Sequence, residues 1–194
     1  ASLSVIAILI STISVRAIAI GNEQRAELIA DIEGVEIAPS ESENGIWLTG
    51  DSVILGIRSS LAEKFPVSLV NARVGRQAPE LLEEVLDDKE SAPRGPVILN
   101  LGNNGELSEE IVIELLDALS AQPTIILVNT AVPRPWRDGN NELISRIGSR
   151  YSNLRIIDWN SISTGHPEYF APDGVHLVPT GVAIYVAEIA KYLE

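Results

Sequence analysis

The sequence contains a serine at a position suited to a nucleophile. Apolar residues run from Ile46 into Gly50-Asp51-Ser52, and residues 53–61 then carry apolar side chains at helical spacing. A buried strand that breaks at glycine into a helix leaves the turn residue beside the free backbone N–H groups of the helix start. A hydroxyl at that point is exposed and electrostatically favoured as a nucleophile. Ser52 is therefore the candidate nucleophile.

A serine nucleophile needs a base to take its proton and a third group to hold that base. The chain has two histidines, His166 and His176, so an imidazole base must be one of them. Asp173 precedes His176 by three residues, a spacing that lets an aspartate in a tight turn reach one ring nitrogen. The order Ser, Asp, His is one that acyl-transfer folds use. An ordinary turn with a surface His176 is the alternative, and His166 is interpreted as a structural hydrogen-bonding residue.

A tetrahedral intermediate needs hydrogen-bond donors at its oxygen. The candidates are the backbone N–H of Ser52, the backbone N–H of Gly75 and the side-chain amide of Asn104. Glycine suits this role because a backbone N–H approaches a substrate closely only where no side chain intervenes. Turn formation is the alternative role for Gly75 and Asn104.

Short apolar runs alternate with helical patterns along the chain. Strands are predicted over residues 45–50, 66–71, 96–101, 124–129 and 154–158, and helices over 53–65, 79–89, 108–119, 140–151 and 180–193. This alternation predicts an α/β fold, a three-layer α/β/α sandwich around a five-stranded parallel sheet with right-handed crossovers. Ligands bind outside the carboxyl ends of such strands, which is where the polar clusters of this sequence fall.

Composition excludes several classes of function. The formal net charge is −13, with 27 acidic and 14 basic residues, so nucleic acid and anionic membrane surfaces are unfavourable partners. The chain has no cysteine, which excludes disulfides, thiolate metal sites and a cysteine nucleophile. Phosphate-binding glycine motifs are absent, and no cluster of histidines and carboxylates indicates catalytic zinc. We therefore predict neither a metal nor a cofactor.

The first 44 residues differ in composition from the rest of the 194-residue chain. Residues 1–20 are rich in isoleucine and uncharged apart from Arg16, and we interpret them as the end of a membrane helix, or its outer flank, from a longer protein. A buried strand or helix of the domain has equal weight on the pattern alone. Residues 21–44 are predicted to be a linker with a short helical pattern at Leu28, Ile29 and Ile32, and residues 45–194 a catalytic domain.

Taken together, these motifs resemble a known superfamily. Gly50-Asp51-Ser52, Gly75, Gly102-Asn103-Asn104 and Asp173-x-x-His176 match in order and spacing the four blocks of the SGNH (GDSL-like) hydrolases. More narrowly, the motifs at residues 71–77, 101–105, 129–136, 158–159 and 165–170 resemble the extracytoplasmic SGNH domain of acyltransferase-3 fusion proteins. Peptidoglycan O-acetyltransferases of the OatA type are the best-known case. The resemblance covers residues 45–194 and implies a flavodoxin-like sheet.

The resemblance implies a role for each matched residue. Ser52 would be the nucleophile, His176 the general base and acid, and Asp173 its orienter, with Ser52, Gly75 and Asn104 as the oxyanion hole. Gly105 stands where typical esterases of the superfamily carry aspartate, and this departure favours transfer over general lipase activity.

The implied reaction is O-acylation, most simply O-acetylation, of a cell-surface glycan such as peptidoglycan through a serine acyl-enzyme. An integral-membrane acyltransferase domain would present the acyl donor, outside the cytoplasm and tethered to the membrane. Arg76, Arg134 and Trp136 are candidates for positioning the acceptor, with an indole face for the sugar and guanidinium groups for oxygens. Packing over the sheet is the alternative role for Trp136. The rival interpretations of the domain are a secreted carbohydrate esterase or lipase and a non-catalytic glycan-binding module.

Overall fold

The computed structural model describes residues 22–193. The chain divides into two compact units, Ala1–Gly34 and Val35–Glu194. The described part of the first unit is one helix over residues 22–34, within the range predicted to be a linker. The apolar segment at residues 1–20 lies outside the described residues. Within residues 22–193 no helix has both the length and the apolar character needed to cross a membrane.

The second unit begins before Asn44, where the sequence places the domain boundary. The backbone N–H of Ser40 donates to the Val67 carbonyl oxygen at 2.7 Å. The carbonyl oxygen of Ser42 accepts a hydrogen bond from the hydroxyl of Ser68 at 2.8 Å. These bonds tie residues 35–44 to the sheet despite their polar composition, which had indicated a solvated linker.

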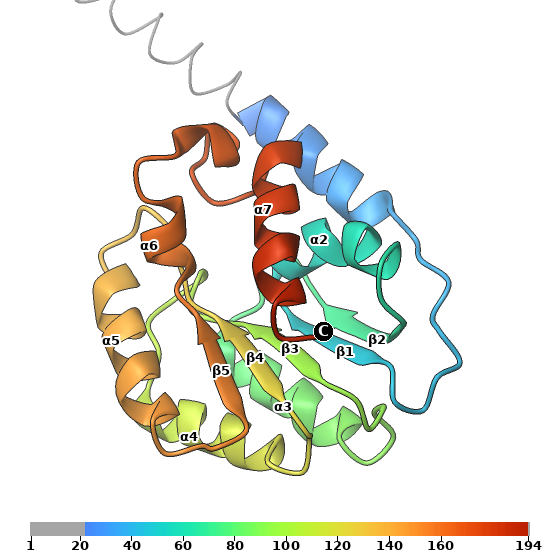
Figure 1. The fold of residues 1–194 in the computed structure, drawn as a ribbon. Coiled ribbons are helices and arrows are strands. Elements are labelled where there is room, and N and C mark those ends of the chain that lie inside the picture. Colours follow the sequence, from blue (N-terminus) through green and yellow to red (C-terminus); the bar gives the residue numbers. More distant parts are fainter. Residues whose placement is uncertain (1–21, 194) are drawn as a thin grey trace, which may run out of the picture. The chain divides into compact units, whose positions relative to one another are not determined.

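Five parallel strands form one sheet in the order β2-β1-β3-β4-β5 (Figure 1). They are β1 (Ile46–Gly50), β2 (Val67–Ala72), β3 (Val97–Asn100), β4 (Ile125–Val128) and β5 (Leu154–Ile157). In this register Thr49 of β1 lies opposite Asn71 of β2 and Leu99 of β3. The predicted fold class is confirmed, and all five predicted strands are present within two residues of their predicted ends.

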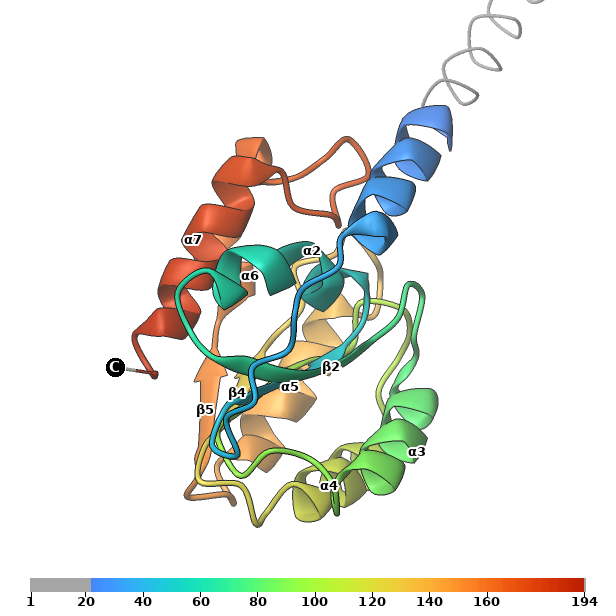
Figure 2. The same ribbon diagram turned by 90° about the vertical axis from the view of Figure 1, so that its right-hand side faces the viewer.

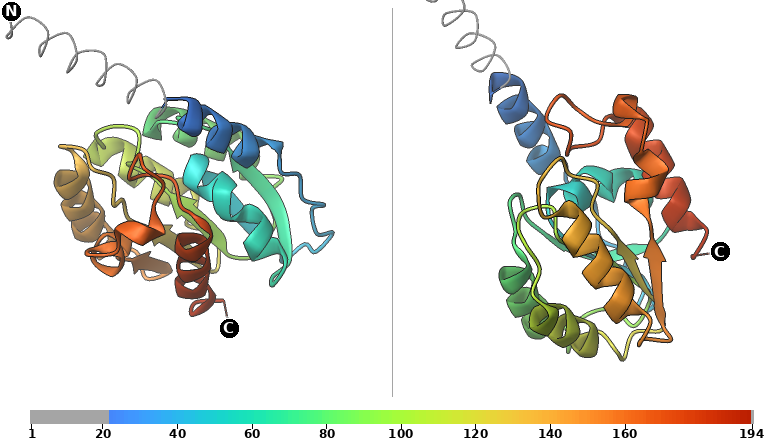
Figure 3. Two further views of the ribbon diagram at one scale, coloured as in Figure 1. Left: turned by 90° about the horizontal axis from the view of Figure 1, so that it is seen from above. Right: turned by 90° about the vertical axis from the view of Figure 1, so that its left-hand side faces the viewer.

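Helices cover both faces of the sheet (Figures 2 and 3). The long helices are α2 (Ser52–Ala62), α3 (Ala78–Asp88), α4 (Glu109–Ala118), α5 (Arg137–Gly148) and α7 (Pro179–Ala190). The chain runs from β1 outward to β2 and then crosses back over β1 to β3. Because crossovers are right-handed, this reversal puts α2 on one face and α3, α4 and α5 on the other. The two strands at the reversal, β1 and β3, flank the point where such sheets bind ligands.

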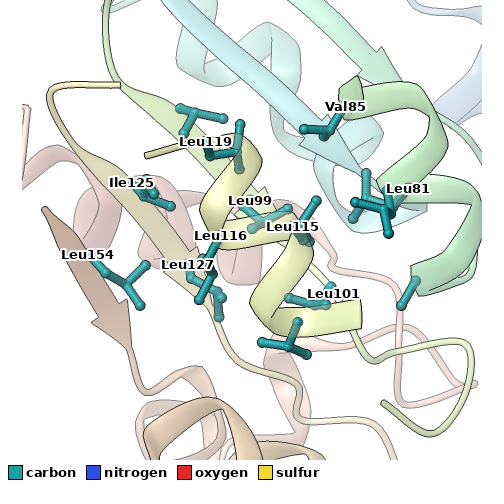
Figure 4. Packing of buried hydrophobic residues seen from close by; sticks show 14 of the residues in the cluster. Leu81, Val85, Leu99, Leu101, Leu115, Leu116, Leu119, Ile125, Leu127 and Leu154 are labelled. Carbon is teal, nitrogen blue, oxygen red and sulfur yellow. The ribbon is translucent and has the colours of Figure 1, made fainter. Parts of the chain in front are cut away.

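Each face of the sheet buries its own apolar cluster. Toward α3, α4 and α5 the core includes Leu81, Leu99, Leu115 and Leu127; in Figure 4, Leu99 and Leu115 lie near the centre and Leu81 lies on α3 at the right. Side chains alternate along a strand, so the neighbouring residues, such as Ile98, face α2 and α7 instead. Burying a leucine or isoleucine contributes about 1.5–3 kcal/mol. A sheet buried on both faces accounts for the nearly continuous apolar runs of the sequence.

The stretch between β5 and the last helix, where no helix or strand was predicted, contains two short helices. They are α6 (Trp159–Ser163) and a short 3-10 helix, η1 (Pro167–Tyr169). The Asp158 side chain caps α6 by accepting a hydrogen bond from the Ser161 N–H at 3.1 Å. Trp159 is 3% exposed and packs edge-on against Tyr185 of α7, with ring centroids 4.9 Å apart. These contacts anchor the segment that leads to His176.

Candidate active site

The turn between β1 and α2 fixes the position of Ser52. Gly50 has φ +149°, and a Cβ there would lie 2.8 Å from the Asn100 carbonyl oxygen, so this position requires glycine. Asp51 is the N-cap of α2 and accepts a hydrogen bond from the Val53 N–H at 2.9 Å. Ser52 is the first residue of the helix, so its own N–H is one of the free donors at the helix start.

The structure brings Ser52, His176 and Asp173 together as a hydrogen-bonded chain. The Ser52 hydroxyl oxygen lies 3.0 Å from His176 Nε2, across 124 residues of sequence. Nδ1 of the same ring lies 2.6 Å from Asp173 Oδ2. Asp173 Oδ1 accepts hydrogen bonds from the N–H groups of Val175 at 2.9 Å and His176 at 3.1 Å. The predicted tight turn therefore holds both the carboxylate and the ring.

The electrostatic environment determines the protonation of Asp173 and the tautomer of His176. Burial favours a raised pKa for Asp173, but hydrogen bonds from the His176 ring and from the N–H groups of Val175 and His176 outweigh it. They lower the pKa of Asp173 to about 2. An ionised Asp173 accepts a hydrogen bond from the Nδ1–H of His176, and in that tautomer the Nε2 lone pair faces the Ser52 hydroxyl. This is the tautomer that a general base needs.

The second histidine has a different environment. His166 lies at the surface, with Nδ1 2.9 Å from Glu168 Oε1 and its ring stacked on Tyr169 at a centroid distance of 4.7 Å. These contacts agree with the structural role expected for His166, and they leave His176 as the imidazole beside the serine.

The three expected oxyanion donors differ in their surroundings. Gly75 has φ +72° and nothing within 4 Å of a Cβ position, and its loop is joined to Gly50 by the Arg73 N–H at 3.2 Å. The Asn104 amide nitrogen donates to Asp51 Oδ2 and to the Arg76 carbonyl oxygen, both at 3.2 Å. An amide nitrogen carries two hydrogens, so both are engaged. Asn104 must exchange one of these long bonds before it can donate to an oxyanion.

A buried polar network beneath the serine was not predicted from the sequence. Asn103 Nδ2 donates to Asp51 Oδ2 at 3.0 Å and to Asn100 Oδ1 at 2.6 Å. The Thr130 hydroxyl donates to Asn103 Oδ1. The network thus joins the carboxyl ends of β1, β3 and β4. The position of Asp51 immediately before a predicted helix was the one sequence signal for it, because aspartate is a preferred N-cap.

Asp51 is the titratable centre of this network and is 2% exposed. Burial raises the pKa of its carboxyl to about 6, although hydrogen bonds from the Val53 N–H and Asn103 and the charges of His176 and Arg76 act to lower it. As a carboxylate it accepts three N–H groups, from Val53, Asn103 and Asn104. The position of the Asn104 amide therefore depends on the ionised form of Asp51.

The residues predicted to contact substrate lie in different environments. Arg76 is 7% exposed, and its guanidinium donates to the Asn71 carbonyl oxygen at 2.7 Å and to Asn71 Oδ1 at 2.8 Å. This burial favours a structural role for Arg76 over contact with substrate. Arg134 is exposed, and Trp136 is half-buried with its indole N–H donating to the Gly102 carbonyl oxygen at 3.1 Å. Trp136 thus lies against the segment that carries Asn104.

Comparison with known proteins gives the same family as the motifs. The chain is 40% identical over 146 residues to the peptidoglycan O-acetyltransferase OatA of Listeria monocytogenes, covering 75% of this chain and 23% of the relative. The chain spans about a quarter of the length of the curated relatives it matches. No protein-family model matches the chain.

Solved structures share the fold. The C-terminal catalytic domain of Streptococcus pneumoniae OatA, solved with a methylsulfonyl adduct, superposes with a TM-score of 0.66 at 23% identity, covering 77% of this chain and 92% of that domain. A lipase/acylhydrolase from Enterococcus faecalis gives a TM-score of 0.61 at 19% identity, covering 76% and 94%. With these relatives, this sheet order and these motifs, the chain is identified as an SGNH (GDSL-like) hydrolase domain of the OatA type.

Proposed function

We propose that this domain is a serine-dependent O-acyltransferase that moves an acyl group, in the simplest case acetyl, to a hydroxyl of a cell-surface glycan such as peptidoglycan. The observation that carries the proposal is the continuous chain from the Ser52 hydroxyl through His176 to Asp173, with contacts of 3.0 and 2.6 Å. The name of the Listeria monocytogenes relative supports peptidoglycan as the acceptor and acetyl as the group transferred.

In the first half-reaction Ser52 takes the acyl group. His176 Nε2 removes the Ser52 hydroxyl proton while Oγ attacks the carbonyl carbon of the donor ester, and a tetrahedral oxyanion forms. The N–H groups of Ser52 and Gly75 and the amide of Asn104 stabilise this oxyanion. When the intermediate collapses, the bond to the leaving oxygen breaks and that oxygen takes the proton from Nε2. Asp173 stabilises the transient imidazolium throughout.

In the second half-reaction the acyl-enzyme is resolved by an acceptor hydroxyl. Nε2 removes the acceptor proton, the acceptor oxygen attacks the acyl carbon, and Ser52 leaves with the proton returned from Nε2. Water attacks by the same route and gives hydrolysis, which is the expected side reaction. A transferase must therefore position its acceptor, and oriented groups reach effective molarities of about 10⁵ M or more.

The resemblance to the OatA type supports a proposal for the acyl donor and for the location of the domain. An integral-membrane acyltransferase domain would present the donor, and the SGNH domain would act outside the cytoplasm, tethered at the cell surface. The −13 charge of the chain suits an uncharged or weakly charged acceptor better than a polyanion.

Intact mass spectrometry tests the acyl-enzyme directly. The protein is mixed with 4-nitrophenyl acetate, and wild type should gain the mass of one acetyl group on Ser52, whereas Ser52→Ala should gain none. His176→Ala should abolish steady-state turnover of the same ester. Near-normal turnover in either variant would remove the assignment of the nucleophile or the base.

A second measurement separates transfer from hydrolysis. Peptidoglycan fragments and other surface sugars are offered side by side with the ester, and the O-acetylated products are quantified by mass spectrometry. Transfer predicts an acetylated glycan whose yield rises with acceptor concentration at the expense of free acetate. A high rate of acetate release that no glycan alters would instead identify an esterase.

A further inference from the structure

A groove runs beside the catalytic rim between the loop that follows Asn104 and the first turns of α5. It has a volume of about 490 Å³, and its walls include Glu106, Leu107, Trp136, Gly139 and Glu142. Asn104 and Glu106 are two residues apart, so their Cα atoms lie within about 7.6 Å of each other. The wall of the groove is therefore the direct continuation of the loop that carries an expected oxyanion donor.

The groove is held in shape by buried hydrogen bonds. Asn140 is 3% exposed, and its amide nitrogen donates to the carbonyl oxygens of Gly102 at 3.0 Å and Gly105 at 2.9 Å. Its Oδ1 accepts the Leu107 N–H at 2.9 Å. The indole N–H of Trp136 donates to the same Gly102 carbonyl, which fixes the ring plane while the ring stays partly exposed. An aromatic face on a rigid wall is what a sugar ring stacks on at low entropic cost.

The carboxylates that line the groove favour a ligand without negative charge. Glu106 and Glu142 are both exposed, and neither forms an ion pair with any residue in the range 22–193. Arg146 also lines the groove, and its guanidinium is paired with Glu109 at 3.0 Å and interacts more weakly with the charge of Glu142. Two unpaired carboxylates accept hydrogen bonds from hydroxyl and amide N–H groups and repel a ligand carboxylate.

We infer that this groove is the acceptor subsite of the domain, which binds an uncharged, hydroxyl-bearing sugar ring stacked on Trp136 and hydrogen-bonded to Glu106 and Glu142. This inference rests on the proposed function, because the ring it holds belongs to the glycan whose neighbouring unit receives the acyl group at Ser52. It also predicts that the bound glycan runs from Ser52 past Asn104 toward α5. It also adds a selectivity against sugar units that bear a carboxylate at this subsite.

The inference is tested by measuring sugar binding to a variant that lacks the nucleophilic hydroxyl. In the Ser52→Ala protein, a neutral oligosaccharide of N-acetylglucosamine is titrated while tryptophan fluorescence is recorded. Trp47 and Trp159 are 0% and 3% exposed, so Trp136 is the indole of the chain that a ligand in the groove would reach. We expect a saturable change in emission. A uronic acid oligosaccharide of the same length should bind at least tenfold more weakly.

Gly139 provides a matched pair of variants. It lines the groove within α5, and nothing lies within 4 Å of a Cβ at this position. Gly139→Leu should fill the groove, and since an alanine or leucine in a helix is more stable than glycine, the melting temperature should not fall. Sugar affinity should drop at least tenfold in Gly139→Leu and stay within about twofold in Gly139→Ala. In the otherwise wild-type enzyme, Gly139→Leu should also lower the ratio of transfer to hydrolysis.

The outcomes separate this inference from the proposed function. Equal sugar affinity in the two Gly139 variants, no fluorescence change, or preferred binding of the uronic acid oligosaccharide would each overturn the subsite. Because the titration needs no reactive serine, sugar binding in the groove by a protein that only hydrolyses esters would refute the proposed transfer and leave the binding site standing.

Discussion

Replacing Asp173 with asparagine tests the proposed catalytic chain at its most specific point. The two side chains have the same shape, and an asparagine Oδ1 keeps the bonds that Asp173 accepts from the N–H groups of Val175 and His176. The amide NH₂ then faces His176 Nδ1 in place of Oδ2, which lies 2.6 Å away in the native protein. Two donors cannot share that contact, so the ring must move its proton from Nδ1 to Nε2. Nε2 then donates toward Ser52 and cannot act as its base.

The expected loss follows from that change of tautomer. Turnover of 4-nitrophenyl acetate by Asp173→Asn should fall about 10⁴-fold, the scale set by the same substitution in other serine hydrolases, which corresponds to about 5.5 kcal/mol of barrier. Residual activity from the oxyanion hole should remain measurable. Nitrogen-15 NMR of the ring gives a direct readout, because Nδ1 should carry the proton in wild type and Nε2 in the variant.

Asp173→Ala is the control for this prediction. It removes the ring contact and both backbone hydrogen bonds, so it should lower the free energy of unfolding as well as turnover, at about 1 kcal/mol for each lost bond. Asp173→Asn should lose activity without that loss of backbone bonds. Turnover above a tenth of wild type in Asp173→Asn, with the proton still on Nδ1, would refute the assignment of Asp173 as the orienting group.

Three further substitutions test residues that lie near Ser52, His176 and Asp173. Asn104→Ala should reduce kcat for ester hydrolysis about 10²–10³-fold with little change in KM, as the loss of one oxyanion donor does, and a change in KM alone would contradict that role. Asp51→Asn should reveal a pH-dependent term in urea denaturation: the pKa of Asp51 is about 6 when folded and 3.8 as a model group, so stability present below pH 3.8 is lost as pH rises through 6. Relative to the variant, wild type should lose about 2.5 kcal/mol of unfolding free energy between pH 4 and pH 7.5, and parallel curves would refute the raised pKa. Arg76→Gln should destabilise the fold by about 1–3 kcal/mol in urea denaturation because it removes the hydrogen bonds that the buried guanidinium donates to Asn71, whereas unchanged stability with weaker acceptor binding would return Arg76 to the substrate site.

The sequence predicted the parts of the site that depend on local geometry. The turn at Gly50 and the three-residue spacing from Asp173 to His176 are short-range patterns, and their consequences are visible in a single window of sequence. The sheet was predictable for the same reason, because each strand is a short apolar run between polar turns. Joining the two windows needed the rule that carboxyl ends of parallel strands share one edge, and also the resemblance to the SGNH hydrolases, because the spacing alone left a surface His176 as an alternative.

The sequence did not predict features that depend on long-range contacts. Arginine is a residue type that often binds substrate oxygens, so Arg76 was predicted to contact substrate. Only the fold shows that its guanidinium is buried and donates to carbonyl oxygens at the ends of β1 and β2. Asn104 was expected to present a free amide, but Asp51 and the Arg76 carbonyl occupy both of its hydrogens. Residues 35–44 are polar and still pair with the sheet, since backbone hydrogen bonds carry no signal in side-chain composition.

The buried network explains how side chains from separate strands are held in register at the rim. Asp51 precedes the serine, Asn103 precedes Asn104, and Thr130 follows β4. Two hydrogen bonds, from Asn103 to Asp51 and from Thr130 to Asn103, therefore connect three strand ends. Burying a carboxylate is unfavourable, and the three N–H groups that donate to Asp51 offset only part of that cost, since its pKa stays raised to about 6. Asp51 is joined to Ser52 along the chain and accepts a hydrogen bond from the Asn104 amide. If Ser52 and Asn104 moved apart, the buried carboxylate would lose that partner, so their separation is constrained. We infer that preorganisation of the oxyanion site depends on Asp51, whose side chain accepts hydrogen bonds from Val53, Asn103 and Asn104, while His176 is the partner of the reacting hydroxyl.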